Sequence, residues 1–138
     1  MKLMNLVSKA FSPSSVASID SALKDFVEQS KHVNSAVIST REGIIVGSYA
    51  PEKTSLKKLS AMCSSIYTQA VSVSHEISDD PCNILTIESD SKKIIFYSIQ
   101  NSKPAVFLTL IADKEKLLGE LLFSAKSCSS IIEDLLKS

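Results

Sequence analysis

The sequence predicts an α/β fold of the α+β kind, with a five-stranded antiparallel sheet between helices in the order α-β-β-α-β-β-β-α. Three long segments repeat apolar residues every three or four positions, which is typical of amphipathic helices. Five short runs rich in β-branched and aromatic residues lie between turn residues, which is typical of strands. Most links between consecutive strands are too short for a crossover, so neighbouring strands are expected to pair antiparallel.

The first helix is expected to begin after residue 12. Ser12 suits the N-cap and Pro13 suits the first helical position, where its missing N–H costs nothing. The helix is expected to end near Lys31. Apolar residues follow at helical spacing: Val16, Ile19, Leu23, Phe26 and Val27. We therefore divide the 138 residues into an N-terminal extension, residues 1–12, and one domain, residues 13–138.

A hairpin follows the first helix. Residues 35–40 and 44–49 are rich in β-branched residues and predict two strands. Between them, Arg41-Glu42-Gly43 predicts a turn, in which glycine adopts a positive φ without steric cost.

The central helix is expected to begin at Thr54 or Ser55. Its apolar positions recur at steps of three and four: Leu56, Leu59, Met62, Cys63, Ile66, Ala70, Val73 and Ile77. It is expected to end before Ser78, because Pro81 and the short polar residues before it disfavour a helix. Three strands at residues 83–89, 93–100 and 105–112 then form a meander, and a closing helix spans residues 114–137.

The strands place apolar residues on both faces of the sheet, as residues 94–97 and 106–108 show. Both faces must therefore be covered, and three helices divide as two on one face and one on the other. A single helix about 10 Å wide cannot cover five strands spaced roughly 4.8 Å apart. The face with one helix is therefore expected to need a partner, which predicts a dimer.

Composition excludes several classes of function. The 15 basic and 15 acidic residues balance, and no basic stripe is present, so we expect no nucleic-acid partner. The three cysteines have no regular spacing, which favours reduced thiols and a cytoplasmic location. No apolar stretch is long enough to cross a bilayer, and residues 1–12 lack the features of a signal peptide, so we expect no membrane role.

No constellation of residues indicates catalysis, so the chain is not expected to be an enzyme. The three glycines form no phosphate-binding loop, and no serine lies in a nucleophile motif. Cys63 is better explained as a buried small hydrophobe, and His32 and His75 as surface or interface residues, than as catalytic groups or metal ligands. Asp79-Asp80 is better explained as a solvated loop. We therefore expect no catalytic residue, no cofactor and no metal.

Arg41, the only arginine, lies at the predicted hairpin tip. It is a candidate contact for a partner, in the manner of an arginine finger, although a solvent-exposed turn residue is the simpler interpretation. Lys92-Lys93 is most simply a solvated pair that also protects a hairpin against aggregation.

Three segments resemble the roadblock/LC7 domain family. Residues 35–48, SAVISTREGIIVGS, resemble its first hairpin, in which an acidic-Gly turn leads into an apolar strand that ends in small residues. The predicted helix that begins with residues 56–62 is similar to the long central helix of the family. Residues 107–113 and 117–119 are similar to its final strand and to the start of its closing helix. The resemblance covers residues 13–138 and is greater to the longer members, the gliding-motility regulators and lysosomal scaffold subunits.

The resemblance implies a non-enzymatic scaffold that forms a homodimer, or a dimer with a related roadblock subunit, and binds a Ras-like small GTPase. In such a dimer the central helices pack together and the strand at residues 83–89 pairs across the axis. The residues expected at that interface are Leu56, Leu59, Met62, Cys63, Ile66, Ala70, Val73, Ile84, Thr86 and Glu88. The alternative is a small-ligand sensor of the PAS or GAF kind, although one long helix replaces the several short helices usual in such domains.

Overall fold

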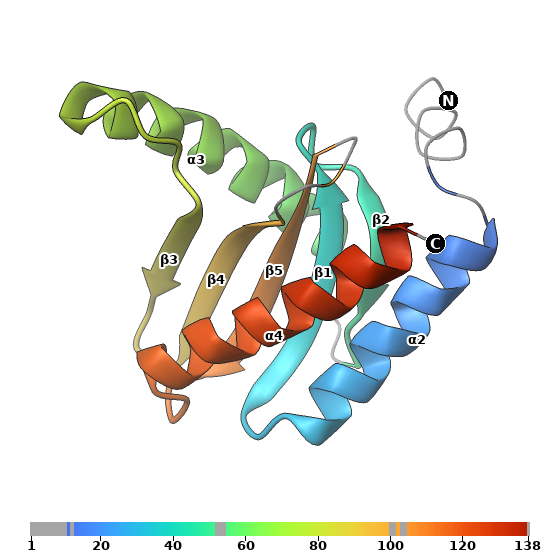
Figure 1. The fold of residues 1–138 in the computed structure, drawn as a ribbon. Coiled ribbons are helices and arrows are strands. Elements are labelled where there is room, and N and C mark those ends of the chain that lie inside the picture. The colour runs from blue at the N-terminus through green and yellow to red at the C-terminus, as the bar shows by residue number, and fades with distance from the viewer. Residues whose placement is uncertain (1–10, 12, 52–54, 100–101, 103–104, 138) are drawn as a thin grey trace.

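The computed structural model describes residues 11, 13–51, 55–99, 102 and 105–137. Its elements are α2 (Pro13–Gln29), β1 (Val33–Thr40), β2 (Ile45–Tyr49), α3 (Leu56–Ile77), β3 (Ile84–Glu88), β4 (Lys92–Ile99), β5 (Val106–Asp113) and α4 (Leu118–Lys137) (Figure 1). The predicted order α-β-β-α-β-β-β-α is confirmed. Among the described residues, no helix combines the length and apolar character that a membrane span needs.

The five strands form one sheet in the order β2-β1-β5-β4-β3, and every neighbouring pair is antiparallel. The first hairpin and the later meander join where β1 pairs with β5, at the centre of the sheet. The sheet therefore ends at two edge strands, β2 and β3.

The helices lie on the two faces as predicted, with α2 and α4 side by side on one face and α3 on the other (Figure 1). The larger core lies beneath α2 and α4 and includes Ile19 and Leu23 of α2 and Leu121 and Ile132 of α4, all fully buried. Phe11, which precedes α2, also packs in this core. The domain boundary after residue 12 remains a prediction.

A smaller core lies beneath α3. Cys63 and Tyr67 of α3 pack there against Phe96 of β4 and Phe107 of β5. The ring centroids of Tyr67 and Phe107 are 4.6 Å apart, and those of Phe96 and Phe107 are 4.9 Å apart. Three aromatic rings thus fasten one part of α3 to the middle of the sheet.

Two helix boundaries differ from the prediction. Helix α2 ends at Gln29, before Lys31, because the Ser30 hydroxyl donates to the Phe26 carbonyl at 2.7 Å and His32 adopts a left-handed φ of 67°. Helix α4 begins at Leu118, four positions later than predicted. The Lys116 N–H instead donates to the Asp113 carbonyl at 3.0 Å and closes a turn.

Other boundaries are close to those predicted. Ser55 is the N-cap of α3, and the helix ends before Ser78. Gly43 has a φ of 88°, which confirms the turn. The proposed cap at Ser12 and the alternative helix start at Thr54 lie outside the described residues.

Candidate protein-binding surface

Helix α3 is only partly buried by its own chain. Its buried residues are Ser60, Cys63 and Tyr67. After Tyr67, none of its residues is buried. In Figure 1 the C-terminal half of α3 extends past the edge of the sheet. Leu59 and Val71 also pack, partly buried, against the core beneath α3, and most of the other side chains of the helix are available to another molecule.

The exposed side chains include an apolar stripe on α3, formed by Met62, Ile66, Val73 and Ile77. The steps of four, seven and four residues keep these side chains on one side of the helix. At about 100° per residue, the stripe lies roughly 100° around the helix axis from the buried residues. Exposure reaches 54% for Met62 and 82% for Ile77, so this side of the helix is an uncovered apolar flank.

The sheet beside α3 is also incompletely covered. In the β3–β4 ladder, Leu85 lies opposite Phe96, and Ile87 lies opposite Ile94. Opposite residues share a face, and Phe96 belongs to the core beneath α3. Leu85, Ile87 and Ile94 therefore lie on the α3 face, where all three stay half-exposed.

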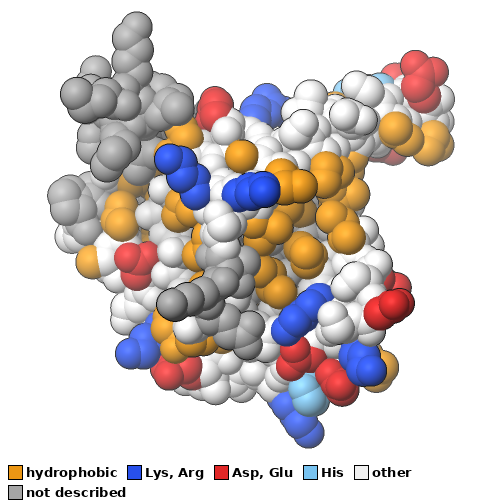
Figure 2. All heavy atoms as spheres, turned by 180° about the vertical axis from the view of Figure 1, so that it is seen from behind, with side chains coloured by type: hydrophobic (Ala, Val, Ile, Leu, Met, Phe, Trp, Pro, Cys, Tyr) orange, Lys and Arg blue, Asp and Glu red, His pale blue; other side chains and the backbone are white. Residues whose placement is uncertain are grey.

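Figure 2 views the molecule from this side and shows hydrophobic side chains gathered beside α3. We call the following residues the α3 surface: Met62, Ile66, Val73, Ile77, Leu85, Ile87 and Ile94. Edge strand β3 borders it, and its outer edge pairs with no strand in the described chain.

The structure places most of the expected interface residues at the surface. Exposed are Met62, Ile66, Val73, Ile84, Thr86 and Glu88, and half-buried are Leu56, Leu59 and Ala70. Cys63 is the exception, because it is only 2% exposed and faces the sheet. Burial raises the pKa of its thiol. Cys63 is therefore removed from the interface set, while its interpretation as a buried small hydrophobe agrees with its position.

The strand residues of the expected interface do not lie beside the apolar stripe of α3. Thr86 lies opposite Ile95, which packs in the larger core on the α2–α4 side. Ile84, Thr86 and Glu88 therefore point to the face opposite α3. Sequence reasoning missed their neighbours Leu85 and Ile87. Alternate residues of a strand point to opposite faces, but the sequence does not show which of the two alternating sets points toward α3.

Arg41 lies exposed at the hairpin tip and is held against α3. The Ser64 hydroxyl donates to the Arg41 carbonyl. Burial and the Cys82 thiol raise the pKa of the Tyr67 hydroxyl, whereas the nearby Arg41 guanidinium lowers it. By helical geometry, Ser64 lies on the side of α3 away from the apolar stripe. The Arg41 backbone is therefore bound on the side of α3 away from the apolar stripe.

A polar cluster that sequence reasoning missed lies at the opposite end of the strands. The Lys92 ammonium contacts the Asp113 carboxylate at 2.8 Å and donates to the Asn34 side chain at 3.0 Å. Hydrogen bonding from Lys92 holds the pKa of Asp113 below its ordinary value. The Lys93 ammonium donates to the Lys114 and Lys116 carbonyls. The interpretation of Lys92-Lys93 as a merely solvated pair was therefore wrong.

Ligand atoms of His32, Asp113 and Glu115 lie within 4.8 Å of one another, a set that could hold a metal ion. The Asp113 carboxylate is already bonded to Lys92 and, at 3.4 Å, to Asn34. The Lys92 ammonium thus lies where a cation would bind this carboxylate, and we assign no metal to the cluster. No sequence motif indicates this cluster, since its residues lie far apart in the chain.

Comparison with known proteins decides the family. A family model described as the Roadblock/LC7 domain matches residues 19–112, more than half of the chain. The chain belongs to the Roadblock/LC7 family. This match favours the roadblock/LC7 prediction over the PAS or GAF alternative. A search of curated proteins found no match.

Solved structures show the same fold. A Roadblock/LC7 domain from Streptomyces avermitilis has 18% identity and a TM-score of 0.76, and the match covers 86% of this chain and 98% of that one. The gliding protein MglB from Thermus thermophilus has 11% identity and a TM-score of 0.78, with 92% and 94% covered. A structure of MglB with tetrameric arrangement has 11% identity and a TM-score of 0.80, with 92% and 93% covered.

Proposed function

We propose that this Roadblock/LC7 domain forms a homodimer through the α3 surface and the β3 edge, and that the dimer is a non-enzymatic regulatory platform for a Ras-like small GTPase. The observation that carries the proposal is the uncovered apolar flank of α3 beside an open edge strand.

Self-association would remove both an apolar surface and an unpaired strand edge from water. Soluble monomers rarely keep large contiguous apolar patches in water, and such patches mark interaction sites. An open strand edge also presents unpaired N–H and C=O groups. A twofold axis brings the same patch of two copies together, so one contact can bury both stripes and pair both β3 edges. The part of α3 after Tyr67, which has no buried residue, would gain packing there.

The family supports the GTPase part of the proposal. Roadblock/LC7 proteins generally act in regulation and not in catalysis, and the chain shares the fold of MglB, a gliding protein known in a tetrameric arrangement. The second flank of α3, which carries Lys57, Thr68, Ser72 and His75, stays outside the proposed dimer contact. Arg41 lies on that side and is the proposed contact for the GTPase.

Charge placed in the apolar stripe tests the dimer. We expect wild-type protein to have a mass near twice 15.0 kDa by light scattering. Ile66→Asp and Val73→Asp should each shift the mass toward the monomer, because an unpaired charge buried in an interface costs several kcal/mol. Thr68→Asp is the matched control on the polar flank of the same helix and should stay dimeric.

Leu59→Asp is less informative than these variants. Leu59 packs against the core beneath α3, so its replacement by a charge is also expected to damage folding. Circular dichroism should show that the Ile66 and Val73 variants keep native helix content. A native-like dimer of Ile66→Asp, or a wild-type monomer that resists concentration, would contradict the proposed surface.

The partner is tested by mixing the dimer with Ras-like GTPases of the same organism, loaded with GDP or with a GTP analogue. We expect a larger, nucleotide-dependent species in light scattering. Arg41→Ala should weaken that complex without changing the mass of the dimer, since Arg41 lies apart from the stripe. Loss of the dimer in Arg41→Ala would refute the separation of the two contacts, and no complex with any GTPase would refute the partner alone.

A further inference from the structure

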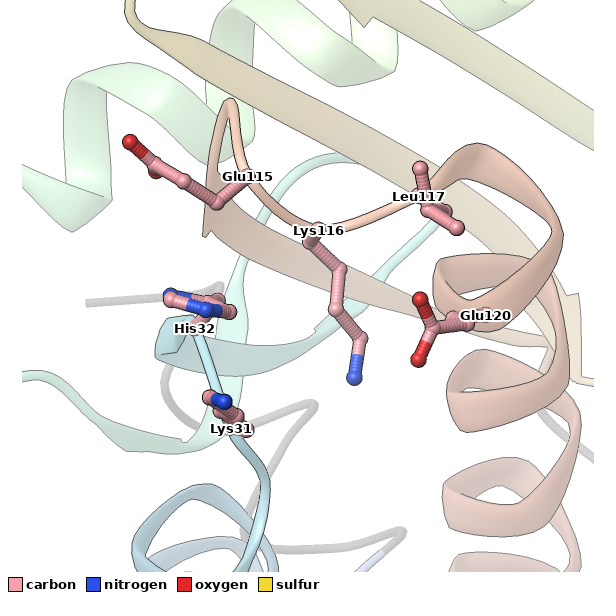
Figure 3. A pocket seen from close by; sticks show the side chains of 6 residues that line it. All are labelled: Lys31, His32, Glu115, Lys116, Leu117 and Glu120. Carbon is pink, nitrogen blue, oxygen red and sulfur yellow. The ribbon is translucent and has the colours of Figure 1, made fainter.

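A pocket of about 360 Å³ lies at the end of the sheet far from α3's N-terminus, between two turns. Lys31 and His32 of the α2–β1 turn line one side. The β5–α4 turn and the start of α4 line the other, through Glu115, Lys116, Leu117 and Glu120 (Figure 3). Its volume is within the range of small-molecule sites.

Lys116 is the unusual residue of this pocket. It is only 8% exposed, although lysine is almost never buried unless its charge is paired. Within the described chain its ammonium makes no hydrogen bond and no ion pair. Figure 3 shows the side chain directed into the space between Lys31 and Glu120. Its three N–H donors therefore face the pocket, where water or a ligand must supply the acceptors.

The backbone around Lys116 is fixed on both sides. Its N–H donates to the Asp113 carbonyl at 3.0 Å, and its carbonyl accepts from the Lys93 ammonium at 2.6 Å. The direction of the side chain is thus set before any ligand arrives, which lowers the entropy cost of binding.

The first turn of α4 adds to the positive potential. The first intrahelical bond runs from the Leu121 N–H to the Leu117 carbonyl, so the preceding N–H groups have no acceptor within the helix. Helix N-termini of this kind favour phosphate groups. Gly119 in this turn leaves open space where a Cβ would stand.

Two carboxylates also line the pocket. Glu115 points away from the Lys116 ammonium, whereas the Glu120 carboxylate is turned toward it without reaching ion-pair distance (Figure 3). Glu120 therefore opposes an anion at this position and sets a limit on its affinity.

We propose that this pocket binds the phosphate group of a small molecule, with Lys116 as its main ligand and Lys31 as a second cation. The family match ends at residue 112, before Lys116, and the proposed dimer contact does not include this pocket.

Inorganic phosphate is the probe, with sodium chloride used to keep the ionic strength constant. We expect phosphate to raise the melting temperature of the full chain and to shift the amide NMR signals of residues 31–32 and 115–121 in a saturable way. Lys116→Met should abolish both effects or weaken binding at least tenfold. Lys114→Met, which removes the same charge from an exposed position of the same turn, should respond like wild type.

Two further variants separate binding from a structural role. Without phosphate, Lys116→Met should melt at or above the wild-type temperature, because an apolar side chain of similar length replaces the ammonium of a largely buried residue. Glu120→Gln should bind phosphate several-fold more tightly. A Lys116→Met protein that melts well below wild type, a phosphate response equal in Lys114→Met and Lys116→Met, or no saturable response in wild type would each overturn the proposal.

Discussion

At the scale of single residues, Gly47 shows how closely α2 packs on the sheet. A Cβ on Gly47 would lie 2.5 Å from the Ile19 Cγ2 atom and 3.0 Å from an Asp20 carboxylate oxygen. Ile19 is fully buried and β-branched, so it has little freedom to move away. The same Asp20 carboxylate accepts from the Ser48 N–H at 2.8 Å, which ties α2 to edge strand β2.

Gly47→Ala is therefore expected to destabilise the domain by about 1–3 kcal/mol, the usual cost of overpacking a tight contact. Urea unfolding followed by circular dichroism measures the change. Gly119→Ala is the matched control. A Cβ there meets no atom within 4 Å and improves helix propensity, so that variant should be as stable as wild type or slightly more stable. Equal stability of Gly47→Ala and wild type would show that α2 can shift without cost.

At the scale of elements, β4 and β5 are joined at one end by polar side chains as well as by the ladder. Lys92 of β4 pairs with Asp113 of β5, and Asn34 of β1 bonds to both. The pair is about one-third exposed, so its contribution to stability is below about 1 kcal/mol. Its importance lies in fixing the turn from which Lys116 enters the pocket.

The contribution of Asp113 to folding stability decreases as the pH falls. The hydrogen bond from Lys92 holds the folded-state pKa of Asp113 below the ordinary 3.8, so the unfolded chain binds the proton more readily. The stabilisation is fully present above that ordinary value and is lost as the pH falls through the lower folded-state value. We expect Asp113→Asn to lose less stability than wild type over this acid range.

Melting temperatures measured from neutral pH to about pH 2.5 test this linkage. Asp80→Asn is the control, because Asp80 lies exposed in a loop and its carboxylate has no bond from Lys92. Identical acid profiles for wild type and Asp113→Asn would contradict the role of the pair.

At the scale of the whole molecule, the two faces of the sheet differ in how well they are covered. Two helices bury a large continuous core on one face. On the other face α3 is held by Cys63, Tyr67 and two phenylalanines, and no residue of α3 after Tyr67 is buried. The proposed dimer would complete this thinner layer.

Hydrogen exchange provides a test of that difference. Amide hydrogens of residues 68–77 should be protected at least tenfold more in concentrated than in dilute protein, because association stabilises only the folded state that it contacts. The protection of amides of α4 around Leu121 and Ile132 should depend on protein concentration only as far as the global free energy of unfolding does. Protection of residues 68–77 that does not depend on concentration would indicate that α3 is stable without a partner.

The sequence by itself determined the elements and their order. Helical spacing and alternating strand residues are local properties, and so is the glycine turn at Gly43. Apolar residues on both sides of the strands also determined that the helices divide between two faces. That one face lacks full cover followed from helix width and strand spacing alone.

Only the tertiary structure decided which side chains remain available. The sequence pattern groups Cys63 with Met62, yet strand register and helix rotation bury one and expose the other. The same register turns Leu85 toward α3 and Thr86 away from it. The Lys116 pocket depends on two turns about eighty residues apart that meet only because β1 pairs with β5. Such pairings are long-range, and local patterns carry no information about them.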